Sequence, residues 1–396
     1  MSFAFRRQPL KAFFLLGSFV YIAAAIPVWA LTNALPSWRP RRSWSLKRAV
    51  LVNLVRLYVG ITYHIGAPPT PPLESYEEDA PSIAWVEPAT PDLIVGEIRE
   101  LAEQNGVRPV KVGGFWLGPK GPDGVAGQRA KPEERVVYHL HGGAHVRGTS
   151  HPGGSMGPGY EALMECFGPK TRIFTLEYRL ASAAPYPAAN PFPSALLDAI
   201  AGYRYLLHDV GFSPQQIIIS GDSAGGGIAL NLARYLALSS LPSLPQAGAL
   251  LLLSPTMDWG RTYAADPRSA FRRNVRSDFV AAIMEADYTA RALRGKLPAE
   301  FVRSSLWISP GARGAAWAPG AFAGLPPTLV VAGEAEQTLD GMRAVRDRMR
   351  EDVGEGPGRL TYVEIPDAAH DVLMIKWFEP ERTKALAKIT EWARGL

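Results

Sequence analysis

The sequence IIISGDSAGG, residues 217–226, decides the fold. A short run of β-branched residues is typical of a buried strand. Gly221 and Gly225 lie two positions before and after Ser223, which allows a sharp turn from strand into helix, where a larger side chain would clash. This turn presents the Ser223 hydroxyl at the carboxyl edge of a sheet, above a helix N-terminus. Nucleophilic acyl-transfer chemistry requires a hydroxyl in this position.

A second glycine motif, HGGAH at residues 141–145, follows a strand-like run at residues 136–140. Glycine lets the main chain approach a ligand closely. We therefore predict that the backbone N–H groups of Gly142, Gly143 and Ala224 stabilise the oxyanion of a tetrahedral intermediate. The alternative is a phosphate-binding loop, but neither motif has the lysine of a Walker loop or the spacing of a dinucleotide site. The two motifs together favour a nucleophilic serine.

From about residue 135 the chain alternates short β runs with helical stretches. This pattern predicts an α/β fold, with a mostly parallel central sheet and helices on both faces. The predicted strands are residues 135–140, 172–178, 216–220, 249–254, 328–332 and 360–365. The predicted helices include residues 193–210, 224–238, 338–352 and 380–396.

A nucleophilic serine in such a fold needs an acid and a histidine, in that order, each just after a late strand. His370 is the only histidine after Ser223, and it follows the last predicted strand. Glu334, Glu336 and Asp340 follow the strand before it. We prefer Glu336 as the acid because it lies in the loop at the strand end, whereas Asp340 is expected to cap the next helix. Glu334 and Asp340 remain alternatives.

Three histidines near the second motif could suggest a metal site. However, the glycines between His139, His141 and His145 are better explained by an oxyanion loop, and no acidic ligand accompanies them. We expect His141 to orient the loop by hydrogen bonding, and we expect neither a metal nor another cofactor. The single cysteine, Cys166, excludes an intrachain disulfide bond.

The positive charge is concentrated at the N-terminus. The formal net charge is +5, but nine basic and no acidic residues precede Glu74, which leaves −4 for the rest of the chain. The basic residues flank apolar runs instead of forming a polar arm. This placement argues against a nucleic-acid partner and favours a membrane lipid surface.

Residues 12–31 are almost wholly apolar, close to the ~20 residues that a helix needs to cross a bilayer. Lys11 marks one end, and Trp29 and Trp38 suit an interface at the other. We predict a membrane anchor; a cleaved signal peptide and a helix packed over the catalytic domain are the alternatives. Residues 44–65 mix apolar and basic residues and predict an amphipathic helix, which lies on a membrane or caps the active site.

Four motifs and one histidine occur in the order of a known family. They are HGGA at residues 141–144, EYRL at 177–180, PYPA at 185–188, GDSAGG at 221–226, and His370. On these segments the chain resembles the hormone-sensitive-lipase-like branch of the α/β-hydrolases. The basic segment PRRSWSLKR at residues 40–48 resembles fungal membrane-associated members similar to steryl acetyl hydrolases. The resemblance implies cofactor-free hydrolysis of carboxylic esters through an acyl-serine intermediate.

The chain departs from the family pattern at three places. Ala144 replaces the third glycine of the oxyanion motif, which is tolerable if its φ is negative. His145 replaces the usual aromatic residue and could narrow or polarise the mouth of the pocket. The usual acid motif, with aspartate two residues after the glycine, is absent around Gly333, so the departure concerns the identity of the acid.

We therefore expect two regions: membrane anchor and amphipathic helices in residues 1–65, and an α/β-hydrolase domain in residues 66–396 with a cap insertion at about 257–320. Ser223 is expected to attack a lipophilic carboxylic ester, of short-acyl or sterol-acetate type, while His370 shuttles the proton and Glu336 orients His370.

The expected partners are this small-molecule ester and a membrane lipid surface, with the endoplasmic reticulum as a candidate membrane. The sequence does not define an oligomeric state. Two alternatives stay open: an amidase, deacetylase or arylformamidase on the same triad, or a non-catalytic lipid-binding protein.

Overall fold

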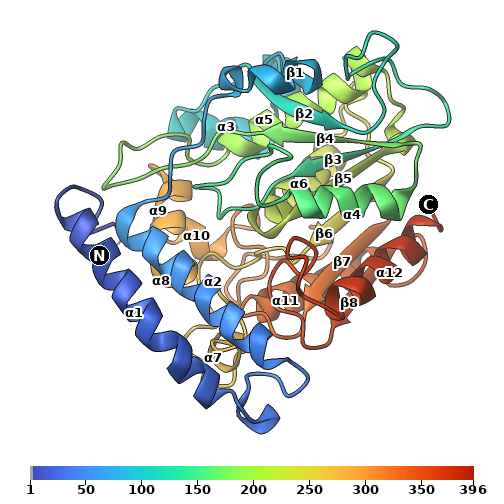
Figure 1. Cartoon of the computed structure of the whole chain (residues 1–396). Coiled ribbons are helices and arrows are strands. Elements are labelled where there is room, and N and C mark those ends of the chain that lie inside the picture. Colours follow the sequence, from blue (N-terminus) through green and yellow to red (C-terminus); the bar gives the residue numbers. More distant parts are fainter. Residues whose placement is uncertain (1–2) are drawn as a thin grey trace.

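An eight-stranded sheet in the order β1-β2-β4-β3-β5-β6-β7-β8 forms the centre of the protein (Figure 1). The structure is a computed structural model that describes residues 3–396. The strands are β1 (Ile83–Val86), β2 (Val112–Leu117), β3 (Arg135–Leu140), β4 (Thr171–Glu177), β5 (Ile217–Asp222), β6 (Ala249–Leu253), β7 (Thr328–Gly333) and β8 (Leu360–Ile365). Pairing is antiparallel from β1 to β2 and from β2 to β4, and parallel across the rest of the sheet.

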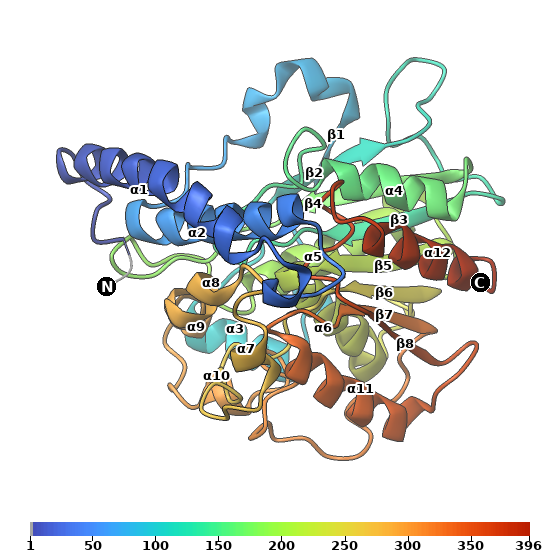
Figure 2. The ribbon, with the colours of Figure 1, turned by 60° about the horizontal axis from the view of Figure 1, so that its bottom comes forward.

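Both faces of strands β3 to β7 are buried, so alternate residues of each strand enter two separate cores. One core packs against α3 (Gly96–Asn105), α5 (Ser194–Arg204), α6 (Ser223–Ser239) and α11 (Leu339–Val353). The other packs against α4 (Gly157–Phe167) and α12 (Glu381–Ala393). Figure 2 shows α4 and α12 on one side of the sheet and α6 and α11 on the other.

The predicted fold class is confirmed, and all six predicted strands are present with ends shifted by at most two residues. Four further elements, β1, β2, α3 and α4, were not predicted from the sequence. The β2 segment contains Gly113 and Gly114, which weaken a strand pattern. Gly114 is required because a Cβ there would meet Phe174 and the main chain of β4.

Four short helices between β6 and β7 occupy the interval of the predicted cap. They are α7 (Ala270–Arg273), α8 (Ala281–Glu285), α9 (Tyr288–Arg294) and α10 (Phe301–Ser304). They cover the carboxyl ends of the parallel strands, where open α/β sheets bind their ligands (Figure 2).

Two long N-terminal helices form an antiparallel pair on the outside of the cap. Helix α1 (Leu10–Thr32) packs on α2 (Leu46–Ile65), and α2 packs on α8 (Figure 1). Val52 of α2 enters the core beneath α4 and α12, while Val59 and Tyr63 join a separate cluster with Tyr288 of the cap. The buried face of α2 therefore packs against the α/β core and the helices between β6 and β7.

A buried ion pair fixes the start of α2 against the C-terminal helix. The Arg48 guanidinium donates to the Glu381 carboxylate, and both side chains are almost fully buried. The guanidinium lies 4.4 Å from the centroid of the Trp44 ring and 5.0 Å from that of Phe378. It also donates to the Asp367 carbonyl at 3.2 Å. This cluster joins the N-terminal region to the loop after β8.

We predict that Arg48→Met lowers the free energy of unfolding by about 3–5 kcal/mol, because it leaves the Glu381 carboxylate buried without a counter-charge. The double variant Arg48→Met/Glu381→Leu should recover most of this loss. Denaturant titration of the purified variants measures both values. The control is Lys388→Met, which breaks the exposed pair with Glu391 (2.9 Å) and should change stability by no more than about 0.5 kcal/mol. Equal effects of Arg48→Met and Lys388→Met would contradict this account.

Candidate active site

The turn from β5 into α6 holds Ser223 in a conformation that non-glycine residues rarely adopt. Its φ is +49°, and α6 begins at this residue. The turn requires glycine on both sides: a Cβ on Gly221 would overlap the main chain of Gly225, and a Cβ on Gly225 would overlap the Leu140 carbonyl. The close packing of strand, turn and helix therefore forces the serine outward, as the sequence motif predicts.

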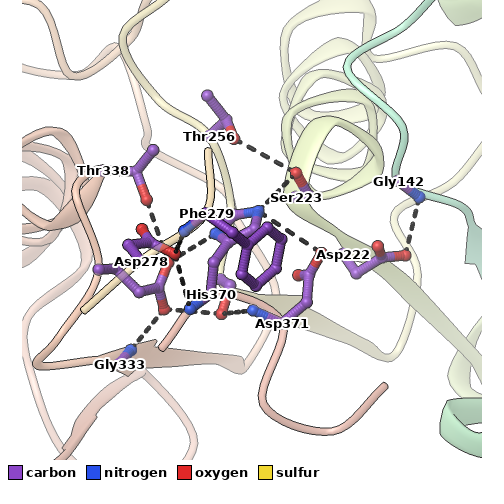
Figure 3. A network of polar contacts seen from close by, with 12 residues as sticks. Gly142, Asp222, Ser223, Thr256, Asp278, Phe279, Gly333, Thr338, His370 and Asp371 are labelled. Atoms are coloured by element: carbon purple, nitrogen blue, oxygen red, sulfur yellow. Dashed lines mark hydrogen bonds and ion pairs between the residues drawn. The ribbon is translucent and has the colours of Figure 1, made fainter. Parts of the chain in front are cut away.

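Ser223, His370 and Glu336 form a continuous hydrogen-bonded chain (Figure 3). The distance from Ser223 Oγ to His370 Nε2 is 2.8 Å, and that from His370 Nδ1 to Glu336 Oε2 is also 2.8 Å. The His370 and Glu336 side chains are almost fully buried. In this geometry Nε2 can take the serine proton while the carboxylate stabilises the imidazolium that results.

Both carboxylate oxygens of Glu336 accept hydrogen bonds from the protein. Oε1 accepts the Ser254 hydroxyl at 2.7 Å and the Gly333 N–H at 2.6 Å. Oε2 accepts the Thr338 hydroxyl at 3.0 Å in addition to His370. Ser254 and Thr338 were not predicted from the sequence, because hydroxyl residues at strand ends and in loops are too common to single out.

The other two acid candidates lie elsewhere. Glu334 is exposed, and its Oε2 accepts the Asp367 N–H at 3.3 Å. Asp340 lies in the first turn of α11 and accepts the Ala270 N–H of the cap at 2.7 Å. The structure thus brings Glu336, and neither alternative, to the histidine.

The glycine motif after β3 lies beside the nucleophile, but one predicted donor is wrong. The Gly142 N–H donates to Asp222 Oδ1 at 2.9 Å, so it is committed within the protein (Figure 3). The N–H groups of Gly143 and Ala224, and also that of Ala144, make no hydrogen bond within residues 3–396. These three groups are therefore free to bind a developing oxyanion.

Ala144 and His145 both adopt left-handed backbone conformations, with φ of +58° and +61°. The condition under which alanine is tolerated at position 144 without strain, a negative φ, is therefore not met, and the strain costs about 1–2 kcal/mol. Burial, followed by the proximity of His141, lowers the pKa of His145 to about 3, so its ring is neutral at physiological pH. The ring packs edge-on against Trp259, with 5.5 Å between the centroids.

Two neighbouring histidines, His139 and His141, hold the oxyanion loop in place. His139 Nε2 contacts Asp222 Oδ1 at 3.0 Å, and this carboxylate also receives the Gly142 N–H. His141 Nδ1 contacts the Gly142 carbonyl at 2.6 Å and stacks on the Tyr178 ring, as expected of a residue that orients the loop. Within residues 3–396, no group of three or more His, Cys, Asp or Glu side chains could hold a metal ion.

A second carboxylate approaches the catalytic face of His370. Asp371 Oδ2 lies 3.5 Å from Nε2, and Asp371 Oδ1 has no hydrogen-bond partner within residues 3–396 (Figure 3). Burial raises the pKa of Asp371. Burial also disfavours the charged form of His370, but the carboxylates of Asp371, Glu336 and Asp278 outweigh it and raise the pKa of His370.

Residues 137–374 match the family described as the alpha/beta hydrolase fold. An esterase of Acinetobacter venetianus is 29% identical to this chain over 69% of the chain and 80% of its own length. An acetyl-hydrolase of Streptomyces hygroscopicus is 28% identical over 63% of this chain and 71% of its own length. Among solved structures, an esterase from the bacterial hormone-sensitive lipase family is similar, with a TM-score of 0.55, 24% identity, and coverage of 89% of this chain and 98% of its own.

The chain belongs to the α/β-hydrolase fold family. Within that family its sequence relatives are named as an esterase and an acetyl-hydrolase, and the chain is a carboxylic ester hydrolase of this type.

We predict that Asp371→Asn moves the acid limb of the pH profile of kcat/KM to lower pH by about one unit or more. Only neutral His370 can accept the serine proton, and removal of this negative charge lowers the pKa of His370, so the base is available at lower pH. The measurement is ester hydrolysis from pH 4 to 10. Glu334→Gln, which removes an exposed carboxylate at the same sheet edge, is the control and should leave the limb in place. An acid limb that stays in place in Asp371→Asn, or moves to higher pH, would show that Asp371 does not raise the pKa of His370.

Proposed function

We propose that this protein is a serine esterase that cleaves carboxylic esters of lipophilic molecules, of short-acyl or sterol-acetate type, through an acyl-serine intermediate. The observation that carries the proposal is the hydrogen-bonded chain from Ser223 through His370 to Glu336, placed beside unpaired backbone N–H groups. The names of the related esterase and acetyl-hydrolase support ester cleavage.

In this proposal His370 Nε2 takes the proton as Ser223 Oγ attacks the ester carbonyl. The carbonyl oxygen becomes negative and is stabilised by the N–H groups of Gly143 and Ala224, with Ala144 as a third donor. His370 then returns the proton to the leaving alcohol, and the acyl group remains on Ser223. A water molecule, activated by His370 in the same way, releases the acid and restores the serine. The chemistry requires no cofactor.

A cavity of about 580 Å³ beyond the oxyanion loop supports a lipophilic substrate. Val146 and Arg147, which follow this loop, line it, and Phe3, Tyr63 and Tyr288 provide aromatic walls. The volume falls within the range of about 300–1,000 Å³ for small-molecule sites. Phe3, α2, residues 67–70 and the cap supply part of its walls, and residues 146–147 and 177–190 of the core domain supply the rest. Segments outside the core fold would therefore contribute to substrate selection.

We predict that Ser223→Ala lowers kcat for p-nitrophenyl acetate by about 10⁴-fold or more, because no other group is placed to form the acyl intermediate. Labelling by a fluorophosphonate probe should be lost in parallel. Thr256→Val, which removes a hydroxyl 3.4 Å from Ser223 Oγ, is the control and should retain labelling. Turnover retained in Ser223→Ala would disprove the assignment of Ser223 as the nucleophile. A wild-type protein that the probe does not label would favour the non-catalytic alternative. Faster cleavage of p-nitroacetanilide than of the acetate would favour the amidase alternative.

We also propose that α1 anchors the enzyme to a membrane. Within residues 3–396, α1 is the one helix that is long and apolar enough to cross a bilayer, with a mean hydropathy of 2.0. A core helix of similar composition would be mostly buried, but 6% of its most apolar window is buried. Phe13, Leu16 and Phe19 all face outward. An apolar surface of this size is typical of a membrane or partner contact.

We predict that the double variant Phe19→Arg/Val20→Arg moves the protein from the pellet to the supernatant in carbonate extraction of membranes. Each arginine at the centre of a membrane helix costs about 2.5–3.5 kcal/mol on insertion scales. The control Leu238→Arg/Val125→Arg places the same charges at exposed apolar positions outside α1 and should stay in the pellet. A wild-type protein found in the supernatant would support the alternative of a soluble enzyme with α1 as a lid.

A further inference from the structure

A short segment of the cap, residues 274–278, is hydrogen-bonded to the loop that contains Glu336. The Asn274 side-chain amide donates to the carbonyls of Glu334 at 3.0 Å and Glu336 at 2.7 Å. The Ser277 hydroxyl donates to the carbonyl between them, that of Ala335, at 3.0 Å. Three consecutive carbonyls of this loop are therefore bound by side chains that come from the cap.

Asp278, the last residue of this segment, is hydrogen-bonded both to this loop and to the main chain of His370. Its Oδ2 accepts the Gln337 N–H at 2.6 Å, one residue after Glu336. Its Oδ1 accepts the Phe279 N–H at 2.8 Å and the His370 N–H at 3.3 Å. The side chain is fully buried, and Figure 3 shows it beside His370. One carboxylate thus connects the main chain of the acid loop with that of the histidine itself.

We propose that Asp278 is a positioning residue of the active site, which sets the separation of Glu336 and His370 and contributes negative charge beside His370. This inference rests on the proposed esterase function. Asp278 contacts neither Ser223 nor the expected place of the substrate carbonyl, so it acts through the two triad members. A misplacement of reacting groups by about 1 Å can cost 10²-fold in rate, which gives such a residue a large effect.

The electrostatic surroundings support this role over a purely structural one. Burial, opposed by His370 and reinforced by Glu336, raises the pKa of Asp278 to about 6. Arg56 of α2 approaches from the other side, with its guanidinium 3.3 Å from the Asp278 carbonyl, and Asp371 adds a further negative charge. Burial of a carboxylate among other carboxylates lowers the free energy of unfolding. If packing alone were needed at this position, an apolar side chain would be more stable there.

The experiment compares Asp278→Asn with the wild type in ester hydrolysis over pH 4–10. The amide can keep the bonds accepted by one oxygen but loses those of the other. We expect kcat to fall by about 10–100-fold with KM changed less than about threefold, and the acid limb to move to lower pH because His370 loses a negative neighbour. The control is Asp258→Asn, a buried cap carboxylate that binds Thr262 (2.6 and 2.8 Å) and should keep kcat and the limb.

A second readout does not depend on turnover. The proton shared by Glu336 and His370 should give a low-field resonance in the proton NMR spectrum of the wild type, and Asp278→Asn should shift or broaden it. An unchanged kcat, acid limb and resonance in Asp278→Asn would overturn the inference. If the wild type hydrolyses no ester, the proposed function fails, and the resonance alone decides the role of Asp278. Should Asp278→Asn not fold, Ser277→Ala removes one contact to the acid loop and no charge, so it should lower kcat by a smaller factor and shift the resonance while the acid limb stays in place; an unchanged kcat and resonance would overturn the inference.

Discussion

The left-handed turn at Ser223 is the constraint on which the site depends. It ends β5, starts α6, and allows the close approach of Gly225 to the Leu140 carbonyl. Because of this approach, the strand ends of β3 and β5 bring the nucleophile and the oxyanion loop together. The Asp222 carboxylate, next to the serine, then binds the Gly142 N–H and fixes the loop. Strain in the backbone is thus offset by contacts that the same turn creates.

The base side of the site is built differently, from four segments far apart in sequence. The loops after β7 and β8 supply Glu336 and His370, and both loops are bound from outside the sheet. The cap binds them through residues 274–278. The N-terminal region binds the same loops through Arg41, which donates to the Glu334 carbonyl at 3.2 Å, and through Trp44, whose indole N–H donates to the Asp367 carbonyl at 3.0 Å. The position of His370 therefore depends on parts of the chain that the core fold does not include.

The sequence predicted best what is set by local chain geometry. The turn motif, the alternation of strands and helices and the chain order of serine, acid and histidine each follow from short-range patterns, and they located the parallel sheet and the triad candidates. The missed features depend on tertiary contacts. Gly142 was assigned to the oxyanion because nothing in its sequence neighbourhood indicates the bond to Asp222. The positive φ of Ala144 could not be predicted because the loop around it imposes this conformation. Asp278 lies 92 positions from His370, in a segment without a recognisable motif.

The contacts of the N-terminal region fall into two groups along the chain. Those that brace the catalytic loops come from Arg41 onward, whereas α1 contacts mainly α2. The segment at residues 33–38 lies between these two parts. A single proteolytic cut there would separate the apolar helix from an enzyme whose histidine loop keeps its supports. Phe3, which lines the cavity beside Tyr63 and Tyr288, would leave with α1, so the released protein would keep the supports of His370 but lose one wall of that cavity.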